Sequence, residues 1–312
     1  MNAKHSKKAS VQPVSRRKFI GQTVKAALGT GLALGFPSIV PASVFGRYAP
    51  SNRINVAAIG VGRISRGHDM PGVWKHDFAR IMAVCDVDSR RATDGKQLVN
   101  DYYSKKEGKP YDGVKVYTDY RELLLNKDID AVLISTPDHS HAMIGVAAAR
   151  AGKHIYMQKP ASLTISEGRI MTEVISKAGV KFQIGSQQRS AEQFRYAAEL
   201  VRNGRIGELK NVYVGLPGDP PGGNKTEMPV PATLDYNMWL GSTPEVFYTE
   251  ERVHPQKDYG RPGWLRCEQF GAGMITGWGS HHIDSAHWGM GMERSGPVEV
   301  WCEKVEFNTG GL

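Results

Sequence analysis

Two residues of this chain have side chains whose type and sequence context most clearly suit catalysis. They are a lysine and a histidine in separate polar clusters, Lys159 and His281. Lys159 precedes Pro160, which favours an extended backbone at the lysine and directs its ammonium group into a cleft. On a helix, His281 would share a face with Asp284, while His282 would point away. A histidine base beside a carboxylate is suited to proton transfer near neutral pH, so these clusters indicate acid–base chemistry on a small substrate.

Both clusters also have structural interpretations. A lysine that ends a strand is usually solvated, and histidines in an aromatic segment can cap a hydrophobic core. Zinc is a further alternative because His and Asp bind it, but His281, Asp284 and His287 cover a wide arc of a helix. Zinc helices place two histidines compactly at i and i+4. We therefore favour catalysis and expect no metal.

A nucleotide site is indicated by the turn that follows the first long apolar run. Gly60 and Gly62 allow the backbone to turn tightly and to approach a pyrophosphate. The charge of that group then lies at the N-terminus of the next helix, beside Arg63 and Ile64. Ser65 stands where the dinucleotide-binding fingerprint has its third glycine.

A second apolar run, residues 79–85, ends in Asp86, whose carboxylate can accept hydrogen bonds from an adenosine ribose. Asp86 follows the glycine turn by more than the usual ~20 residues, which a long first crossover explains. Its charge would repel a 2′-phosphate, so we expect NAD, although Arg90 and Arg91 leave NADP open.

Polar residues also end two later strands of the expected sheet. Thr136 and Pro137 open a cluster that runs to His141 after the fourth strand, and Gln158 precedes Lys159 after the fifth. Open α/β sheets bind ligands outside the carboxyl ends of their strands, so we expect these residues at the cofactor. The alternative for the first cluster is a proline turn with a capping Asp.

The pattern over residues 52–187 alternates strands with amphipathic helices, which predicts an α/β fold with a doubly wound, parallel Rossmann sheet. The expected strands are residues 54–59, 79–85, 114–117, 131–135, 154–157 and 181–184. The expected helices include residues 120–126, 143–151 and 165–178. The last of them begins with a capping box of Thr164 and Glu167.

Residues 188–312 have a different character and predict an α+β substrate domain with a mainly antiparallel open sheet. We expect a helix at residues 191–203 and strands at residues 211–214 and near 298–307. The Gly/Pro-rich residues 217–231 are expected to form a long loop that shapes the site.

Residues 1–46 are typical of a twin-arginine signal peptide. Residues 15–20 match the twin-arginine pattern, and the apolar stretch at 26–36 is too short and glycine-rich for a stable membrane span. The alternative is a disordered basic tail with a chance arginine pair.

This leader has seven Lys and Arg residues and no acid, so the rest of the +9 chain is close to neutral and has no basic stripe for nucleic acid. We expect export to the periplasm by the twin-arginine translocase, with the nucleotide loaded before export and kept bound.

Together these motifs resemble the Gfo/Idh/MocA oxidoreductases, the family of glucose–fructose oxidoreductase and inositol dehydrogenase. The resemblance extends from residue 52 onward and rests on the order and spacing of short motifs: Gly60 with Gly62, Asp86, Thr136-Pro137 with His141, Lys159-Pro160, residues 202–208, Trp239-Leu240-Gly241 and His281 with Asp284. It implies NAD(P)-dependent oxidation of a sugar or polyol hydroxyl, with Lys159 and His281 flanking the substrate. The exported branch is similar to enzymes that act on glycosides, including oxidation at the 3-hydroxyl.

The candidate substrate-binding residues are Gln187, Arg189, Trp264, Asp284 and His282. Three features depart from the family pattern. Gln158 replaces the usual Glu and removes a charge near the nicotinamide, and Gly277 replaces an Asp that commonly precedes the histidine. The chain also ends soon after His281, so we expect an incomplete second-domain sheet, as in a truncated product, and a homo-oligomer where that sheet is complete.

Oxidation of an alcohol requires removal of the hydroxyl proton as the C–H bond breaks. His281, with an unperturbed pKa of ~6.5, needs little adjustment, whereas the pKa of Lys159 would have to fall by about three units from ~10.4. We therefore assign His281 as the base and Lys159 as the cation that stabilises the reacting oxygen. Two other hypotheses stay open: transient oxidation of a sugar that permits glycoside cleavage or elimination, and a non-catalytic sugar- or nucleotide-binding protein.

Overall fold

The computed structural model describes residues 52–219 and 226–304. The expected twin-arginine signal, residues 1–46, lies outside the described residues, as do residues 305–307 of the last expected strand. Residues 51–312 form one compact unit. Within its described part, no helix has the length and apolar character needed to cross a membrane.

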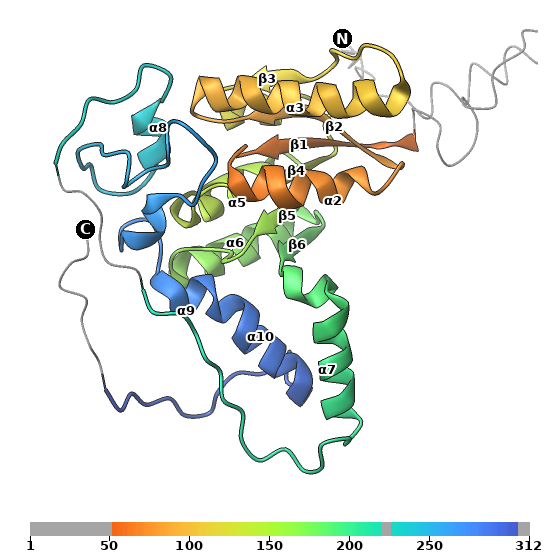
Figure 1. The fold of residues 1–312 in the computed structure, drawn as a ribbon, viewed down its shortest axis with the longest axis vertical. Helices are drawn as coiled ribbons and strands as arrows, with labels where there is room; N and C mark the ends of the chain where they lie inside the picture. Colours follow the sequence, from red (N-terminus) through yellow and green to blue (C-terminus); the bar gives the residue numbers. More distant parts are fainter. Residues whose placement is uncertain (1–51, 220–225, 305–312) are drawn as a thin grey trace, which may run out of the picture. The chain divides into compact units, whose positions relative to one another are not determined.

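Six parallel strands form one sheet in the order β3-β2-β1-β4-β5-β6 (Figure 1). Their bounds are Ile54–Ile59 (β1), Ala79–Cys85 (β2), Lys115–Tyr117 (β3), Ala131–Ile134 (β4), His154–Gln158 (β5) and Phe182–Gly185 (β6). The strand order reverses between β1 and β4, so their carboxyl ends meet at the switch point where such sheets bind ligands. The predicted Rossmann fold is confirmed, and each strand expected within residues 52–187 is present.

The strands of the first half are connected by η3 (Ser65–Asp69), α2 (Met70–Trp74), α3 (Ser89–Glu107), α4 (Tyr120–Leu125), α5 (Asp138–Arg150) and α6 (Ile165–Ala178). Together η3 and α2 lengthen the first crossover, which accounts for the late position of Asp86. The capping box of α6 is confirmed, with Thr164 and Glu167 each accepting from the backbone N–H of the other. α5 begins earlier than expected because the backbone turns into the helix directly after Pro137, within the polar cluster.

Successive side chains of a strand point to opposite faces of the sheet. They form two hydrophobic cores, one on each face. In β1, Ala57 and Ile59 belong to the core that α4, α5 and α6 cover, whereas Ala58 belongs to the core that α2 and α3 cover. Burial on both faces explains why these strands are almost continuously apolar.

The second half contains η4 (Gln187–Ser190), α7 (Glu192–Arg202), α8 (Tyr236–Leu240), η5 (Gly263–Arg266), α9 (Gly273–Gly277) and α10 (Gly279–Met290). Helices α7 and α10 pack side by side (Figure 1). A third core gathers around α8, where Trp239 packs on Phe270 and Tyr236. The helix predicted at residues 191–203 is confirmed as α7.

The strands predicted at residues 211–214 and 298–304 are wrong, and the described residues after 187 form no antiparallel sheet. A strand needs a neighbour that bonds its N–H and C=O groups, and within the described residues neither segment has one. Their apolar side chains consequently lie exposed, as Tyr213 and Trp301 illustrate. Both segments therefore have the composition of a strand but no neighbouring strand, within the described residues, with which to pair.

Candidate functional site

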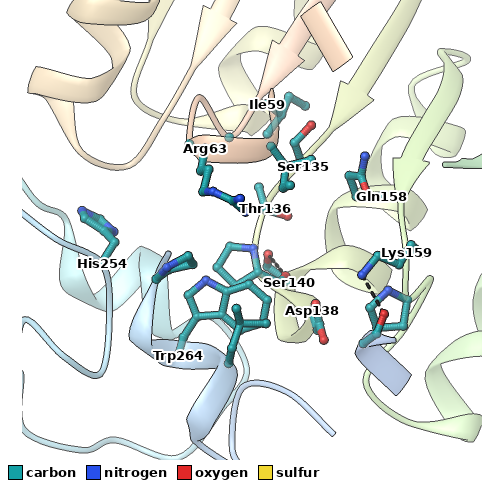
Figure 2. Close-up of a pocket in the computed structure, with 18 of the residues that line it drawn as sticks. Ile59, Arg63, Ser135, Thr136, Asp138, Ser140, Gln158, Lys159, His254 and Trp264 are labelled. Carbon is teal, nitrogen blue, oxygen red and sulfur yellow. Dashed lines mark hydrogen bonds between the residues drawn. The ribbon is translucent and has the colours of Figure 1, made fainter. Parts of the chain in front are cut away.

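A cavity of about 480 Å³ opens at the carboxyl edge of the sheet, where β1, β2, β4 and β5 end. The strand ends form one wall, and residues of the second half, including Trp239, Trp264 and His281, form the other. Figure 2 shows side chains from both halves around the same space. The cavity lies where doubly wound sheets bind nucleotides.

The glycine turn after β1 leaves room for a phosphate group. Gly60 has a φ of +81°, and its N–H donates to the carbonyl oxygen of Cys85 at 2.8 Å. A Cβ at Gly60 would lie 2.8 Å from the Ser135 carbonyl oxygen, whereas a Cβ at Gly62 would meet no atom within 4 Å. The backbone at Gly62 is therefore open, which fits the pyrophosphate of a dinucleotide.

Gly60→Ala should lower the free energy of unfolding by about 2–4 kcal/mol, because it combines an unfavourable positive φ with a backbone clash. Urea unfolding measures this loss. Gly108→Ala is the matched control, since Gly108 has a φ of +66° but a Cβ there would meet nothing within 4 Å. Equal losses in the two variants would show that the Ser135 carbonyl imposes no constraint.

Asp86, directly after β2, braces the glycine turn and faces the cavity. Its Oδ2 accepts a hydrogen bond from the Val61 N–H at 2.8 Å, and its Oδ1 accepts one from the Asp88 N–H at 3.0 Å. Burial raises the pKa of Asp86, and these two donors oppose the shift. Each oxygen keeps a further lone pair, so the carboxylate can also accept ribose hydroxyls.

Residues 253–262, called the strap below, belong to the second half of the chain and contact the start of α3. Arg91 donates from Nη2 to two strap carbonyl oxygens, at Pro255 and at Asp258. The Nε2 atom of His254 lies 3.2 Å from Oδ2 of Asp88. Although burial alone would raise it, the pKa of Asp88 falls to about 2 because of this contact with His254.

Tyr259 of the strap is held between two arginines of the first half. Its hydroxyl donates to Asp94 Oδ2 at 2.7 Å, and its ring centroid lies 4.0 Å from the Arg66 guanidinium carbon and 4.6 Å from that of Arg91. Because Arg91 and the following strap residues Gly260 to Pro262 line the cavity, the strap closes the cavity on the side of β2.

His141 joins two strand ends from behind the cavity wall. Its Nδ1 lies 2.6 Å from the Pro160 carbonyl oxygen and its Nε2 lies 2.8 Å from the Thr136 carbonyl oxygen. Burial lowers the pKa of His141 to about 4, and the two carbonyl oxygens, which only accept, oppose this shift. Thr136 and Pro137 themselves line the cavity, and His141 positions them.

The structure brings Lys159 and His281 to the same cavity, one from the end of β5 and the other from α10. Lys159 donates from Nζ to the Gly277 carbonyl oxygen at 2.8 Å (Figure 2), and burial lowers the pKa of Lys159. Burial, followed by the charges of Lys159 and His282, lowers the pKa of His281 to about 4. The ring is therefore neutral and can accept a proton. It is a weaker base than a histidine with the ordinary pKa.

Asp138, the first residue of α5, is a third ionisable group of this cavity. Burial raises its pKa to about 7, and the charge of Lys159 opposes the shift. Figure 2 shows the Asp138 and Lys159 side chains at the same wall. From sequence, Asp138 belonged to the polar cluster expected at the cofactor, with a capping Asp as the alternative, but it was not named among the site residues; its place at the carboxyl end of β4 is the signal that could have found it.

The five candidate substrate-binding residues divide into two groups. Gln187 and Trp264 line the cavity. Arg189 and Asp284 instead form a bidentate ion pair, with N–O distances of 2.7 and 2.8 Å, that joins η4 to α10. His282 packs against the Trp278 ring, with centroids 5.6 Å apart. None of these last three lies among the described residues that line the cavity, so the Asp284 carboxylate serves Arg189 rather than His281.

Of the candidate cofactor-binding residues, nine line the cavity: Gly60, Gly62, Arg63, Ile64, Asp86, Thr136, Pro137, Gln158 and Lys159. His141 is the exception described above. Across residues 52–219 and 226–304, no three His, Cys, Asp or Glu side chains gather closely enough to hold a metal ion.

Comparison with known proteins gives two matches to one family. Residues 54–186 match the Gfo/Idh/MocA "Oxidoreductase family, NAD-binding Rossmann fold", and residues 221–309 match its "C-terminal alpha/beta domain". The chain is 31% identical over 184 residues to myo-inositol 2-dehydrogenase of Thermotoga maritima, which covers 59% of this chain and 48% of that protein. It is 30% identical over 157 residues to the uncharacterized oxidoreductase YrbE of Bacillus subtilis, which covers 50% and 42% respectively.

Among solved structures, apo scyllo-inositol dehydrogenase from Lactobacillus casei is 29% identical and has a TM-score of 0.42, over 50% of this chain and 43% of that one. The chain spans about half the length of the curated relatives that it matches.

Proposed function

Because the chain belongs to the Gfo/Idh/MocA family of NAD-binding oxidoreductases, we propose that it oxidises a hydroxyl group of a sugar, glycoside or polyol. The observation that carries this proposal is the convergence of Lys159 and His281 on one cavity with the glycine turn. Relatives named as inositol dehydrogenases support a polyhydroxylated substrate.

The residues present fit a dinucleotide along the carboxyl edge of the sheet. The open backbone at Gly62 would hold the pyrophosphate, Asp86 the adenosine ribose, and the ends of β4 and β5 the nicotinamide half. The charge of Asp86 favours NAD over NADP. Arg91, which could bind a 2′-phosphate, is instead engaged by strap carbonyl oxygens.

Bound NAD⁺ supplies the acceptor for the hydride that leaves the substrate carbon. The chain's own residues manage the hydroxyl proton. The neutral ring of His281 accepts it, and the ammonium of Lys159 donates a hydrogen bond to the same oxygen as negative charge develops there. In the free protein one N–H of this ammonium bonds to the Gly277 carbonyl oxygen, and an ammonium has two further N–H groups with which to reach the substrate oxygen.

We further propose that the nucleotide is held tightly and is loaded before export to the periplasm through the twin-arginine translocase. The strap supports tight binding, because its contacts with Arg66, Arg91 and Asp94 must break before the side of the cavity near β2 opens. Export itself is proposed from the leader sequence alone.

Tyr259→Ala should accelerate release of bound NAD⁺ about tenfold or more, since it removes two cation–π contacts and one hydrogen bond to a carboxylate. The measurement is the dissociation rate of NADH, followed by its fluorescence after dilution into excess unlabelled NAD⁺. Tyr213→Ala is the control, because Tyr213 is 94% exposed. An unchanged dissociation rate in Tyr259→Ala would remove the strap from cofactor retention.

The function is tested with protein purified without added nucleotide. It should release NAD(H) on denaturation, and should convert at least one member of a panel of inositols, free sugars and glycosides to a keto product detected by mass spectrometry. A released aglycone without a keto product would instead indicate transient oxidation. Failure to bind NAD⁺ or NADH at millimolar concentration would overturn the proposal.

A further inference from the structure

A polar network lies beside the cavity at the carboxyl ends of β4 and β5, and it joins four segments of the chain: η3, the residue after β4, β5 and η4. Gln187 of η4 donates from Nε2 to Gln158 Oε1 at 3.0 Å, and Gln158 at the end of β5 donates from Nε2 to Asp69 Oδ1 at 2.7 Å. Ser135, at the end of β4, donates its hydroxyl to Asp69 Oδ2 at 2.6 Å. Gln158 and Asp69 are buried, being 5% and 7% exposed.

Asp69 fixes the direction in which this network donates. A glutamine amide is nearly symmetric in shape, so packing alone would accept either orientation at Gln158. An ionised carboxylate only accepts, so the NH₂ of Gln158 must face Asp69 and its carbonyl oxygen must face Gln187. Burial raises the pKa of Asp69, and the donors at Ser135 and Gln158 oppose that shift by favouring the ionised form.

The network ends in an acceptor that has no donor. Because Gln187 uses its NH₂ toward Gln158, its Oε1 is the free end, and this atom is buried without a hydrogen-bond partner within the described part of the chain. Gln187 and Gln158 both line the cavity. Burying an acceptor without a donor is unfavourable, because the atom loses its hydrogen bond to water and gains none in return. A bound ligand that brings an N–H or O–H group to Gln187 removes that penalty.

We propose that Asp69, acting through Gln158, sets Gln187 as the hydrogen-bond acceptor for an N–H or O–H donor of the bound ligands. This inference rests on the proposed function. Asp69 is then a positioning residue, and Gln187 a binding residue for either the carboxamide of the cofactor or a substrate hydroxyl. The arrangement also explains why this chain can have Gln158 where the family resemblance leads one to expect Glu. The negative charge that a Glu would supply is supplied instead by the Asp69 carboxylate, which accepts a hydrogen bond from Gln158.

Exchange of the two groups tests the polarity of the network. Asp69→Asn removes the obligate acceptor and should weaken NAD⁺ binding about tenfold. Gln158→Glu puts two carboxylates together, so its NAD⁺ affinity should fall as the pH rises from about 6 to 9 and the shared proton is lost. In the double variant the amide introduced at position 69 can donate to the carboxylate introduced at position 158, so affinity should return to within about threefold of wild type without this pH dependence. Asp69→Asn that binds NAD⁺ as tightly as wild type, or a double variant no better than Gln158→Glu, would overturn the proposal.

Gln187→Met, which has similar length and no acceptor oxygen, identifies the donor. If the donor is the cofactor carboxamide, wild type should prefer NAD⁺ over its 3-acetylpyridine analogue, which lacks the amide N–H, and Gln187→Met should lose that preference. If the donor is a substrate hydroxyl, the preference should stay and KM for the panel substrate should rise about tenfold with a smaller change in kcat. A variant that changes neither quantity would contradict the assignment of Gln187.

Asp130→Asn is the matched control, since Asp130 accepts from the Asn55 N–H at 2.8 Å at the opposite end of the strands. It should alter stability and leave NAD⁺ affinity unchanged. Wild-type protein that binds no NAD⁺ would reject the proposed function itself. Wild-type binding with unaffected Asp69 and Gln187 variants would reject only the network.

Discussion

His281→Ala should lower kcat by about 10²- to 10⁴-fold, the range that a positioned general base contributes. Two observations support so large an effect. His281 lines the cavity that also holds Lys159, and its Nδ1 is buried without a hydrogen-bond partner within the described residues. Since its pKa is lowered to about 4, mainly by burial, the wild-type ring is neutral from about pH 5 upward. The ratio of wild-type to variant kcat should therefore be constant between about pH 6 and 8.

The measurement is steady-state oxidation of the panel substrate, with bound nucleotide verified in each variant. His287→Ala, further along the same helix α10, serves as the control and should keep wild-type turnover. Lys159→Met should lower kcat by a comparable factor through loss of the cation at the developing alkoxide. Turnover that survives both His281→Ala and Lys159→Met would remove these residues from catalysis.

Asp138→Asn should stabilise the free protein at alkaline pH by about 2–4 kcal/mol while it impairs catalysis. Burial raises the pKa of Asp138 from 3.8 to about 7, so the folded state binds this proton more tightly than the unfolded state. Stability then falls as pH rises through the interval from about 4 to 7, and the whole loss is present above pH 7. A shift of this size corresponds to about 4 kcal/mol as an order of magnitude, and the amide that replaces the carboxyl group does not ionise.

Denaturant unfolding of both proteins at several pH values measures the difference, which should be near zero at about pH 4 and largest at about pH 8. Asp119→Asn provides a control of opposite sign. The pKa of Asp119 is lowered by its hydrogen bond with Arg121, so its stabilisation is present above pH 4 and lost as pH falls, and its replacement should destabilise the protein at neutral pH. If Asp138→Asn is as stable as wild type or less stable at pH 8, then burial of the ionised Asp138 carboxylate does not destabilise the folded protein.

Loss of the Asp138 charge should also affect Lys159, the lysine that we propose to be catalytic. The Asp138 charge opposes the lowering of the Lys159 pKa by burial, so its removal lets that pKa fall further. The alkaline limb of the pH–rate profile should consequently move to lower pH in Asp138→Asn. Such a trade between stability and activity is typical of charged groups held in an active site.

The Rossmann half was largely predictable because its signals are local. Apolar runs such as residues 54–59, the Gly60–Gly62 turn and the capping box at Thr164 each depend on neighbouring residues. The second half was less predictable. Residues 211–214 have strand-like composition, but strand formation requires a partner elsewhere in the chain, and the described residues offer none.

For the site, the sequence by itself determined which residues stand at strand ends, because the period and spacing of a βαβ chain decide which side chains reach the carboxyl edge. Only the tertiary structure decided their partners and charge states: Asp284 pairs with Arg189, Asp69 orients Gln158, and burial lowers the pKa of His281 to about 4. The physical reason is that desolvation and hydrogen-bond polarity depend on segments brought together across the fold, about which local sequence carries no information.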